Sequence, residues 1–242
     1  MKISLLGESA VCILTEISTG EMTMKKKIIM TAFTDPMMGL SYESEPIMER
    51  LKQEYGNQIE FLYVMSLLVR DVSDFMTPEE RRMDAESGIR KYCERLAVIY
   101  KSEESVGGLP INMKGFCLFD ADHHSSKPLN LAYKAAQLAD PEKSEIFLTE
   151  LRHATVIDCL PTTHFDEILK VVRKVGIDET SFKQCYQDGN AEKALAEDLK
   201  YTHSLGIHSL PAYLIQSSDK AIIMQSFEYQ DFVSAIENLT TK

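Results

Sequence analysis

The sequence contains no Cys-x-x-Cys motif and no other closely spaced pair of cysteines. Its five cysteines are scattered along the chain: Cys12, Cys93, Cys117, Cys159 and Cys185. This usage is typical of reduced thiols in a cytoplasmic protein rather than of a disulfide framework. Because neither Cys-x-x-Cys nor His-x-x-x-His spacing occurs, we predict no metal site. The run Asp120-Ala-Asp122-His123-His124 could suggest a metal site, but adjacent histidines in a polar loop lack a fixed geometry, so we favour an exposed loop.

Excess positive charge and long apolar runs are also lacking. The net charge is −11, which argues against non-specific binding to nucleic acid or anionic membranes. No apolar run approaches the roughly 18 residues that a membrane span requires. Phosphate-binding glycine loops, nucleophile elbows and paired catalytic carboxylates are absent. The 242 residues are 44% apolar, which indicates a globular protein of one domain with an insertion, or of two small domains.

The chain is organised around residues 33–45, which follow a short apolar run at residues 28–33. That run predicts a strand buried on both faces. Asp35-Pro36 then breaks the strand, and from Tyr42 the apolar residues recur at helical spacing until Gly56. The segment is therefore predicted to be a strand-to-helix crossing. At such crossings the free N–H groups of a helix start often face a ligand.

The remaining elements complete an α/β pattern. Residues 59–67 predict a second strand parallel to the first. A long helical stretch then begins at Thr77-Pro78 and includes further helices opening at Asp140, Thr163, Asp178 and Asn190. Two strands, at residues 211–216 and 221–225, form a hairpin. A last amphipathic helix follows, with Tyr229, Phe232 and Ile236 on its apolar face.

Two segments resemble the DsbA-type thioredoxin-fold proteins, especially their cytoplasmic, bacterial FrnE-like branch. The first is Phe33-Thr-Asp35-Pro36-Met-Met38-Gly-Leu-Ser41-Tyr42, with Glu45-Pro46 behind it. Members carry Cys-x-x-Cys where this chain has Met38-Gly39-Leu40-Ser41. The second is Gly206-Ile-His208-Ser-Leu210-Pro211-Ala-Tyr213, which is similar to the family's cis-proline segment.

This resemblance implies a thioredoxin fold interrupted by a helical insertion. We assign residues 24–76 and 206–242 to the thioredoxin-like core, residues 77–205 to the insertion, and residues 1–23 to an N-terminal extension that is dispensable for folding. An ordered arm is the other interpretation of residues 1–23. The resemblance also implies a binding groove formed by Asp35, Pro36, Met38, Ser41, His208, Leu210 and Pro211.

Several residues of this groove have more than one interpretation. Pro211 could equally open a strand as a trans proline, and the resemblance favours cis. His208 would act as a proton donor or anion partner, or else simply face solvent. Ser41 would contact a ligand, or serve as the N-cap of the helix at residues 42–55, which we favour.

The substitutions in the motif bear directly on chemistry. Family members stabilise a thiolate at the helix start, and a second cysteine resolves the mixed disulfide. Neither the thioether of Met38 nor the hydroxyl of Ser41 can do this, so we assign no catalytic residue. Kappa-class glutathione transferases and hydroxychromene-carboxylate isomerases carry Ser at the first cysteine position and bind glutathione. This chain has Met38 at that position, so the resemblance to these enzymes fails at the residue that matters.

Two functional hypotheses follow. The first is a binding protein without a cofactor that holds an extended peptide or a protein client in the groove by strand addition. A related group of cytoplasmic DsbA-like proteins presents a transcription factor to a protease. The second is an enzyme, either a thiol-disulfide oxidoreductase or isomerase, or a glutathione-dependent transferase or isomerase, working through an unusual site. Met38 favours the first.

Overall fold

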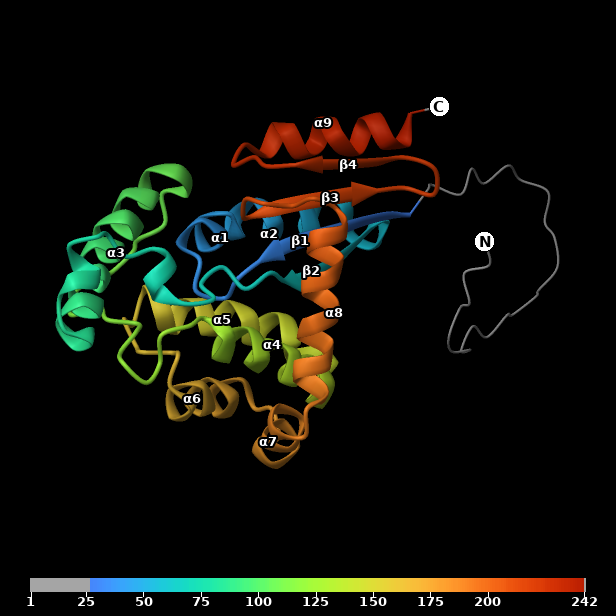
Figure 1. The fold of residues 1–242 in the computed structure, drawn as a ribbon. Helices are drawn as coiled ribbons and strands as arrows, with labels where there is room; N and C mark the ends of the chain where they lie inside the picture. Colours follow the sequence, from blue (N-terminus) through green and yellow to red (C-terminus); the bar gives the residue numbers. More distant parts are fainter. Residues whose placement is uncertain (1–26, 242) are drawn as a thin grey trace, which may run out of the picture.

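A computed structural model describes residues 27–241 (Figure 1). The predicted extension at residues 1–23 lies outside the described residues. A mixed sheet of four strands forms the centre, in the order β2-β1-β3-β4. The strands are β1 (Ile28–Thr34), β2 (Ile59–Met65), β3 (Ala212–Gln216) and β4 (Ala221–Met224). Strand β1 runs parallel to β2 and antiparallel to β3, and β3 pairs antiparallel with β4.

The pairing register brings two distant segments together. Phe33 near the end of β1 pairs with Ala212 at the start of β3. The residues that follow β1 and those that precede β3 therefore lie side by side, although most of the chain separates them in the sequence. This register unites the two segments that resemble the DsbA-type proteins.

Helices surround the sheet (Figure 1). They are α1 (Gly39–Glu43), α2 (Glu45–Tyr55), α3 (Ala85–Gly107), α4 (Lys127–Ala139), α5 (Ser144–Val156), α6 (Phe165–Val175), α7 (Glu179–Gln187), α8 (Asn190–Ser204) and α9 (Tyr229–Thr240). The order of elements, βαβ followed by a helical block and then ββα, agrees with the sequence-based prediction. None of the helices within residues 27–241 combines the length and apolarity needed to cross a bilayer.

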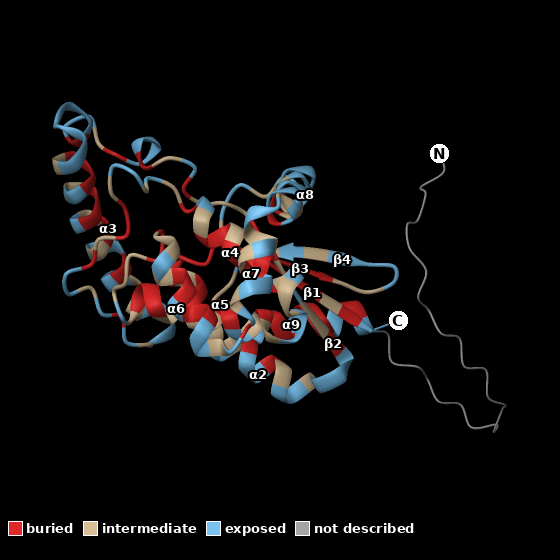
Figure 2. Ribbon diagram, turned by 90° about the horizontal axis from the view of Figure 1, so that it is seen from below, coloured by how far each residue is buried: buried red, intermediate tan, exposed pale blue. Residues whose placement is uncertain are grey.

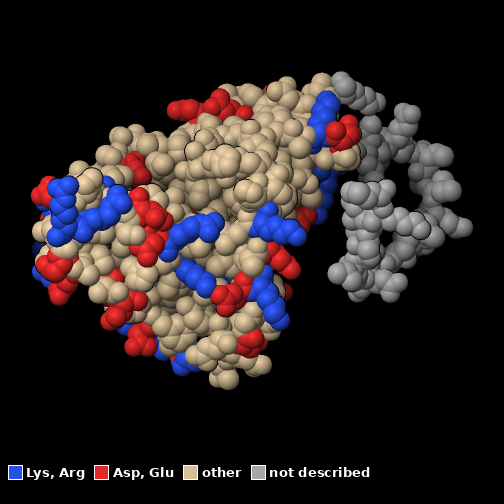
Figure 3. Space-filling view, viewed as in Figure 1, with Lys and Arg blue, Asp and Glu red and all other residues tan. Residues whose placement is uncertain are grey.

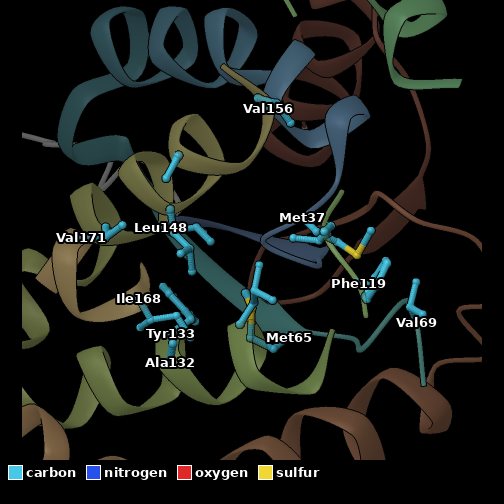
Figure 4. Close-up of a cluster of buried hydrophobic side chains, with 14 of the residues drawn as sticks. Met37, Met65, Val69, Phe119, Ala132, Tyr133, Leu148, Val156, Ile168 and Val171 are labelled. Atoms are coloured by element: carbon cyan, nitrogen blue, oxygen red, sulfur yellow. The ribbon is translucent and has the colours of Figure 1, made fainter. Parts of the chain in front are cut away.

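Buried apolar side chains form two large clusters. The ribbon coloured by burial shows buried residues in the sheet and on the helices around it (Figure 2). One cluster lies between the sheet and the helices α2 and α9, where the Tyr213 and Phe232 rings pack 4.9 Å apart. The larger cluster fills the helical region and reaches Met37 and Met65 at the ends of β1 and β2 (Figure 4). Cys93 of α3 belongs to it and is 1% exposed, so it packs as a small apolar side chain.

Two helix starts predicted from threonine caps were wrong. Thr77 and Glu80 do exchange the hydrogen bonds of a capping box, but these close only a short turn. The long helix begins later, behind Asp84, whose side chain accepts from the Ser87 N–H. Helix α6 follows His164 rather than Thr163, because the Thr163 hydroxyl donates instead to the Leu118 carbonyl.

The predicted helix at residues 42–55 begins earlier and is divided at Ser44. Its first part, α1, starts at Gly39. Ser41 lies inside α1 and its hydroxyl is 2.7 Å from the Thr34 hydroxyl. The N-cap interpretation of Ser41 was therefore wrong. Gly56 does end α2 with positive φ, as predicted.

Candidate functional site

The strand-to-helix crossing is fixed by a buried carboxylate. Asp35 is fully buried, and its side chain accepts hydrogen bonds from the Met37 and Leu68 N–H groups and from the side chains of Ser126 and Asn130. Burial raises the pKa of Asp35, and these four donors oppose the rise. A carboxylate with so many internal partners joins β1 to the helical region and is not free to contact a ligand.

The two positions at which DsbA-type proteins carry cysteine are also buried. Met38 and Ser41 are each 5% exposed, and Pro36 is buried beside them. The Ser41 hydroxyl lies 3.9 Å from the Met38 sulfur. The two side chains thus lie in contact, as a Cys-x-x-Cys pair would. Both are too deeply buried to touch a disulfide bond of another protein.

Helix α3 covers this crossing from outside, and two glycines permit its close approach. A Cβ atom on Gly39 would lie 2.0 Å from the Glu103 carboxyl, and one on Gly107 would lie 2.2 Å from the Glu43 carbonyl oxygen. The Tyr100 hydroxyl donates to the Met37 carbonyl over 2.6 Å. The helical insertion therefore seals the position from which a thiolate would react.

Glu103 puts an acidic group at the start of α1. Its carboxyl accepts a hydrogen bond from the Leu40 N–H, and its pKa is raised to about 7 by burial and then by the nearby Glu43. Burial also raises the pKa of Glu43, which accepts from the Gly107 and Leu109 N–H groups. In this chain the free N–H groups of the helix start thus face a carboxyl rather than a thiolate.

A small cavity of about 110 Å³ lies on the inner side of α1. Ser41, Arg152 and Pro211 line it, together with residues of β1 and α2. Arg152 is 5% exposed, and its guanidinium donates to the Thr34 hydroxyl (3.0 Å) and to Glu45 (3.3 Å). Its Nε has no partner among the described residues.

A larger groove of about 550 Å³ opens on the outer side of the Pro211 loop. The Leu210–Pro211 peptide bond is cis. The groove is lined by Leu205, Gly206, Ile207, His208, Ser209 and Ala212 on one side and by Ile223, Met224 and Gln225 on the other. None of these residues carries a carboxylate, ammonium or guanidinium group, and the surface over β3 and β4 is almost free of charged side chains (Figure 3).

The Gln225 side chain crosses this groove. Its amide nitrogen donates to the Ser209 carbonyl (2.7 Å) and to the Pro211 carbonyl (3.3 Å). These carbonyls flank the cis bond, so an internal amide occupies acceptors that an added peptide strand would otherwise use.

The predicted groove residues therefore fall into two places. Met38 and Ser41 are buried at the start of α1, and Ser41 meets Pro211 at the inner cavity. His208 is exposed in the outer groove, and Leu210 is half-buried next to it. Three residues of the site, Glu103, Arg152 and Gln225, were missed by sequence reasoning. Each is an ordinary polar residue in a helix or strand pattern, without a local signal.

The family of the chain follows from comparison with known proteins. A model of the thioredoxin family matches residues 32–233. The chain belongs to this family, in its DsbA-like form.

Solved structures share this fold. One is a protein from Nitrosomonas europaea, with TM-score 0.69, 17% identity, and coverage of 88% of this chain and 99% of the other. A second is the cytosolic disulfide reductase DsbM from Pseudomonas aeruginosa with GSH, with TM-score 0.63, 14% identity, and coverage of 87% and 98%. A third is the oxidoreductase DsbA from Xylella fastidiosa, with TM-score 0.55, 11% identity, and coverage of 89% and 85%.

Two curated relatives share more of the sequence. The chain is 24% identical over 208 residues to the ClpXP adapter protein SpxH of Halalkalibacterium halodurans, an alignment that covers 86% of this chain and 65% of the relative. It is 25% identical over 229 residues to SpxH of Shouchella clausii, covering 92% of this chain and 69% of the relative. The chain thus spans about two thirds of the length of these relatives.

Proposed function

We propose that this chain is an adaptor that binds an extended, uncharged segment of a client protein in the outer groove. The observation that carries the proposal is the groove beside Pro211, which is open, uncharged and bordered by a sheet edge. The names of the two SpxH relatives support an adaptor role, and the location of the chain is proposed to be cytoplasmic.

Strand addition explains how such a segment is held. Among the described residues, no strand pairs with the outer edge of β4. An extended peptide can form main-chain hydrogen bonds along that edge, while its apolar side chains contact Ile223, which is 47% exposed. Strand β4 has four residues, so the bound segment is about as long as one short strand.

The lack of charge in the groove sets the preferred ligand. A charged side chain would lose hydration there without gaining an opposite charge, whereas an apolar side chain gains about 25 cal/mol for each Å² that it buries. We therefore expect bound peptides to share a short uncharged core. We also expect Gln225 to release the Ser209 carbonyl when the peptide binds.

The test is a set of overlapping peptides that tile known ClpXP substrates, probed with the labelled full-length chain. Ile223→Glu should weaken binding to the selected peptides about tenfold, because it places a charge in the apolar groove. Val98→Glu is the matched control, since Val98 is 70% exposed on α3, outside the groove. Equal binding by wild type and Ile223→Glu would exclude the groove.

A glutathione-dependent enzyme is the second candidate. One observation favours it: Ser41, Arg152 and Pro211 line a common cavity. That cavity is about 110 Å³, whereas small-molecule pockets usually span roughly 300–1,000 Å³. Glutathione would require α5 and α2 to separate, so the geometry supports the adaptor better. A thermal-shift titration with reduced glutathione tests this: stabilisation that Arg152→Met removes would favour the enzyme.

A further inference from the structure

A second polar cluster lies in the helical region, away from both cavities. It consists of Asp120, His123 and His164. The first two residues belong to one loop, and His164 directly precedes α6. The Thr163 hydroxyl donates to the Leu118 carbonyl and holds the two segments together. Asp120 and His123 belong to the run noted in the sequence, whereas His164 lies 44 positions from Asp120 and no local motif indicates it.

The three side chains converge on one point. His123 Nδ1 lies 2.9 Å from Asp120 Oδ1 and 3.2 Å from Oδ2, and His164 Nε2 lies 2.7 Å from Oδ2. The imidazole rings stack with their centroids 3.9 Å apart and an interplanar angle of 25°. All three ligand atoms lie within 4.8 Å of one another.

These separations suit a small divalent cation. Zinc binds imidazole nitrogen and carboxylate oxygen at about 2.0–2.2 Å, so neighbouring ligand atoms in a tetrahedral site lie about 3.3 Å apart. For an ion to enter, the contacts of 2.7 and 2.9 Å must open by about 0.4–0.6 Å, and the imidazole rings must rotate out of their stack so that a nitrogen lone pair of each ring points at the ion. Two neutral imidazoles and one carboxylate form a donor set that first-row transition metals prefer over Mg²⁺ or Ca²⁺.

We propose that Asp120, His123 and His164 form a zinc site that joins the loop at residues 120–124 to the start of α6. Three protein ligands leave one coordination position for water. All three side chains are partly exposed, at 41%, 35% and 37%, so an ion enters directly from solvent. The site is independent of the proposed peptide groove.

The neighbouring His124 provides a matched control. It follows His123 in the sequence, but its Nδ1 pairs with Asp71 over 2.8 Å and does not face Asp120. Replacing it removes one histidine from the same loop without removing a proposed ligand. His164→Gln is a second useful variant, because its amide can still donate to Asp120 but is a poor zinc ligand.

The experiment is calorimetric titration of ZnCl₂ into the chelator-treated, reduced full-length chain. We expect one ion per chain, with binding weakened about tenfold or more by His123→Ala and His164→Gln and unchanged by His124→Ala. Circular dichroism of each variant checks that it is folded. Co²⁺ replaces Zn²⁺ in a parallel measurement and should show d–d bands without a thiolate charge-transfer band.

Three results would overturn the proposal. The first is the absence of saturable one-to-one binding. The second is an equal loss of affinity in His124→Ala, and the third is a thiolate band with Co²⁺, which would assign the ion to cysteines. None of these results bears on peptide binding in the groove.

Discussion

Placing cysteines at positions 38 and 41 tests how the residues around the start of α1 affect a thiol there. In Met38→Cys with Ser41→Cys, the two thiols should form a disulfide, because the present side chains lie 3.9 Å apart. Thiols at helix N-termini usually have a pKa of about 3.5–7.5. Here the Glu103 carboxyl binds the Leu40 N–H and competes for the same positive end of the helix.

The size of the effect follows from Coulomb's law. A carboxylate within about 6 Å, at an effective dielectric constant near 20, raises the pKa of a thiol by about 1–2 units. This rise applies only where Glu103 is ionised, and the pKa of Glu103 is itself about 7, so we expect the rise for a thiol that titrates near or above pH 7. Adding Glu103→Gln removes this charge but keeps a side chain of equal size, so the thiol pKa should fall by about 1–2 units.

The assay is a pH titration of thiolate absorbance, combined with equilibration against glutathione redox buffers. The wild type is the baseline and should not catalyse insulin reduction, since neither Met38 nor Ser41 forms a mixed disulfide. The reasoning fails if the triple variant has the same thiol pKa as the double variant. Catalysis by the wild type that depends on Cys93, Cys117, Cys159 or Cys185 would replace the adaptor account with an enzyme.

Three further predictions concern stability. Burial and Glu43 raise the pKa of Glu103 to about 7 in the folded chain. The protonated carboxyl therefore contributes its full stability to the fold below the unfolded pKa, and this stability is lost as the pH rises through about 7. Urea unfolding should thus show Glu103→Gln gaining about 1–2 kcal/mol over wild type at pH 8 but not at pH 4, after allowance for partial exposure. Gly107→Ala should cost about 2–3 kcal/mol, more than Gly39→Ala, because the new methyl group meets the Glu43 backbone oxygen rather than a movable side-chain carboxyl; equal unfolding midpoints would contradict this packing. Arg152→Met should cost about 2 kcal/mol, because the partly buried Glu45 carboxylate loses the guanidinium and keeps only His153 as a partner. Adding Glu45→Gln should recover part of the loss.

The sequence predicted the fold because its signals are local and agree with one another. The apolar run at residues 28–33 specifies a strand through burial, and Gly56 behind α2 specifies a helix end through its backbone conformation. Errors occurred where a tertiary contact overrode a local signal. The Thr77 capping box closes only a turn, and the Thr163 hydroxyl bonds to the distant Leu118 carbonyl.

The site was less predictable than the fold, for a physical reason. Which face of a helix meets the strand-to-helix crossing depends on packing between distant elements. Glu103 looks like any acidic residue of an exposed helix, and only the approach of α3 to Gly39 gives it a role. Similarly, Arg152 reaches Thr34 across 118 positions of sequence. Such contacts leave no periodic pattern in a single sequence.

Hydrogen exchange of the full-length chain with a peptide selected from the tiled set tests the central claim most directly. If the peptide adds as a strand to β4, the amides of residues 221–225 should exchange more slowly in its presence, while those of residues 39–45 should not change. Slower exchange at residues 39–45 without any change at residues 221–225 would contradict the account, because it would place the ligand at the inner cavity beside Ser41.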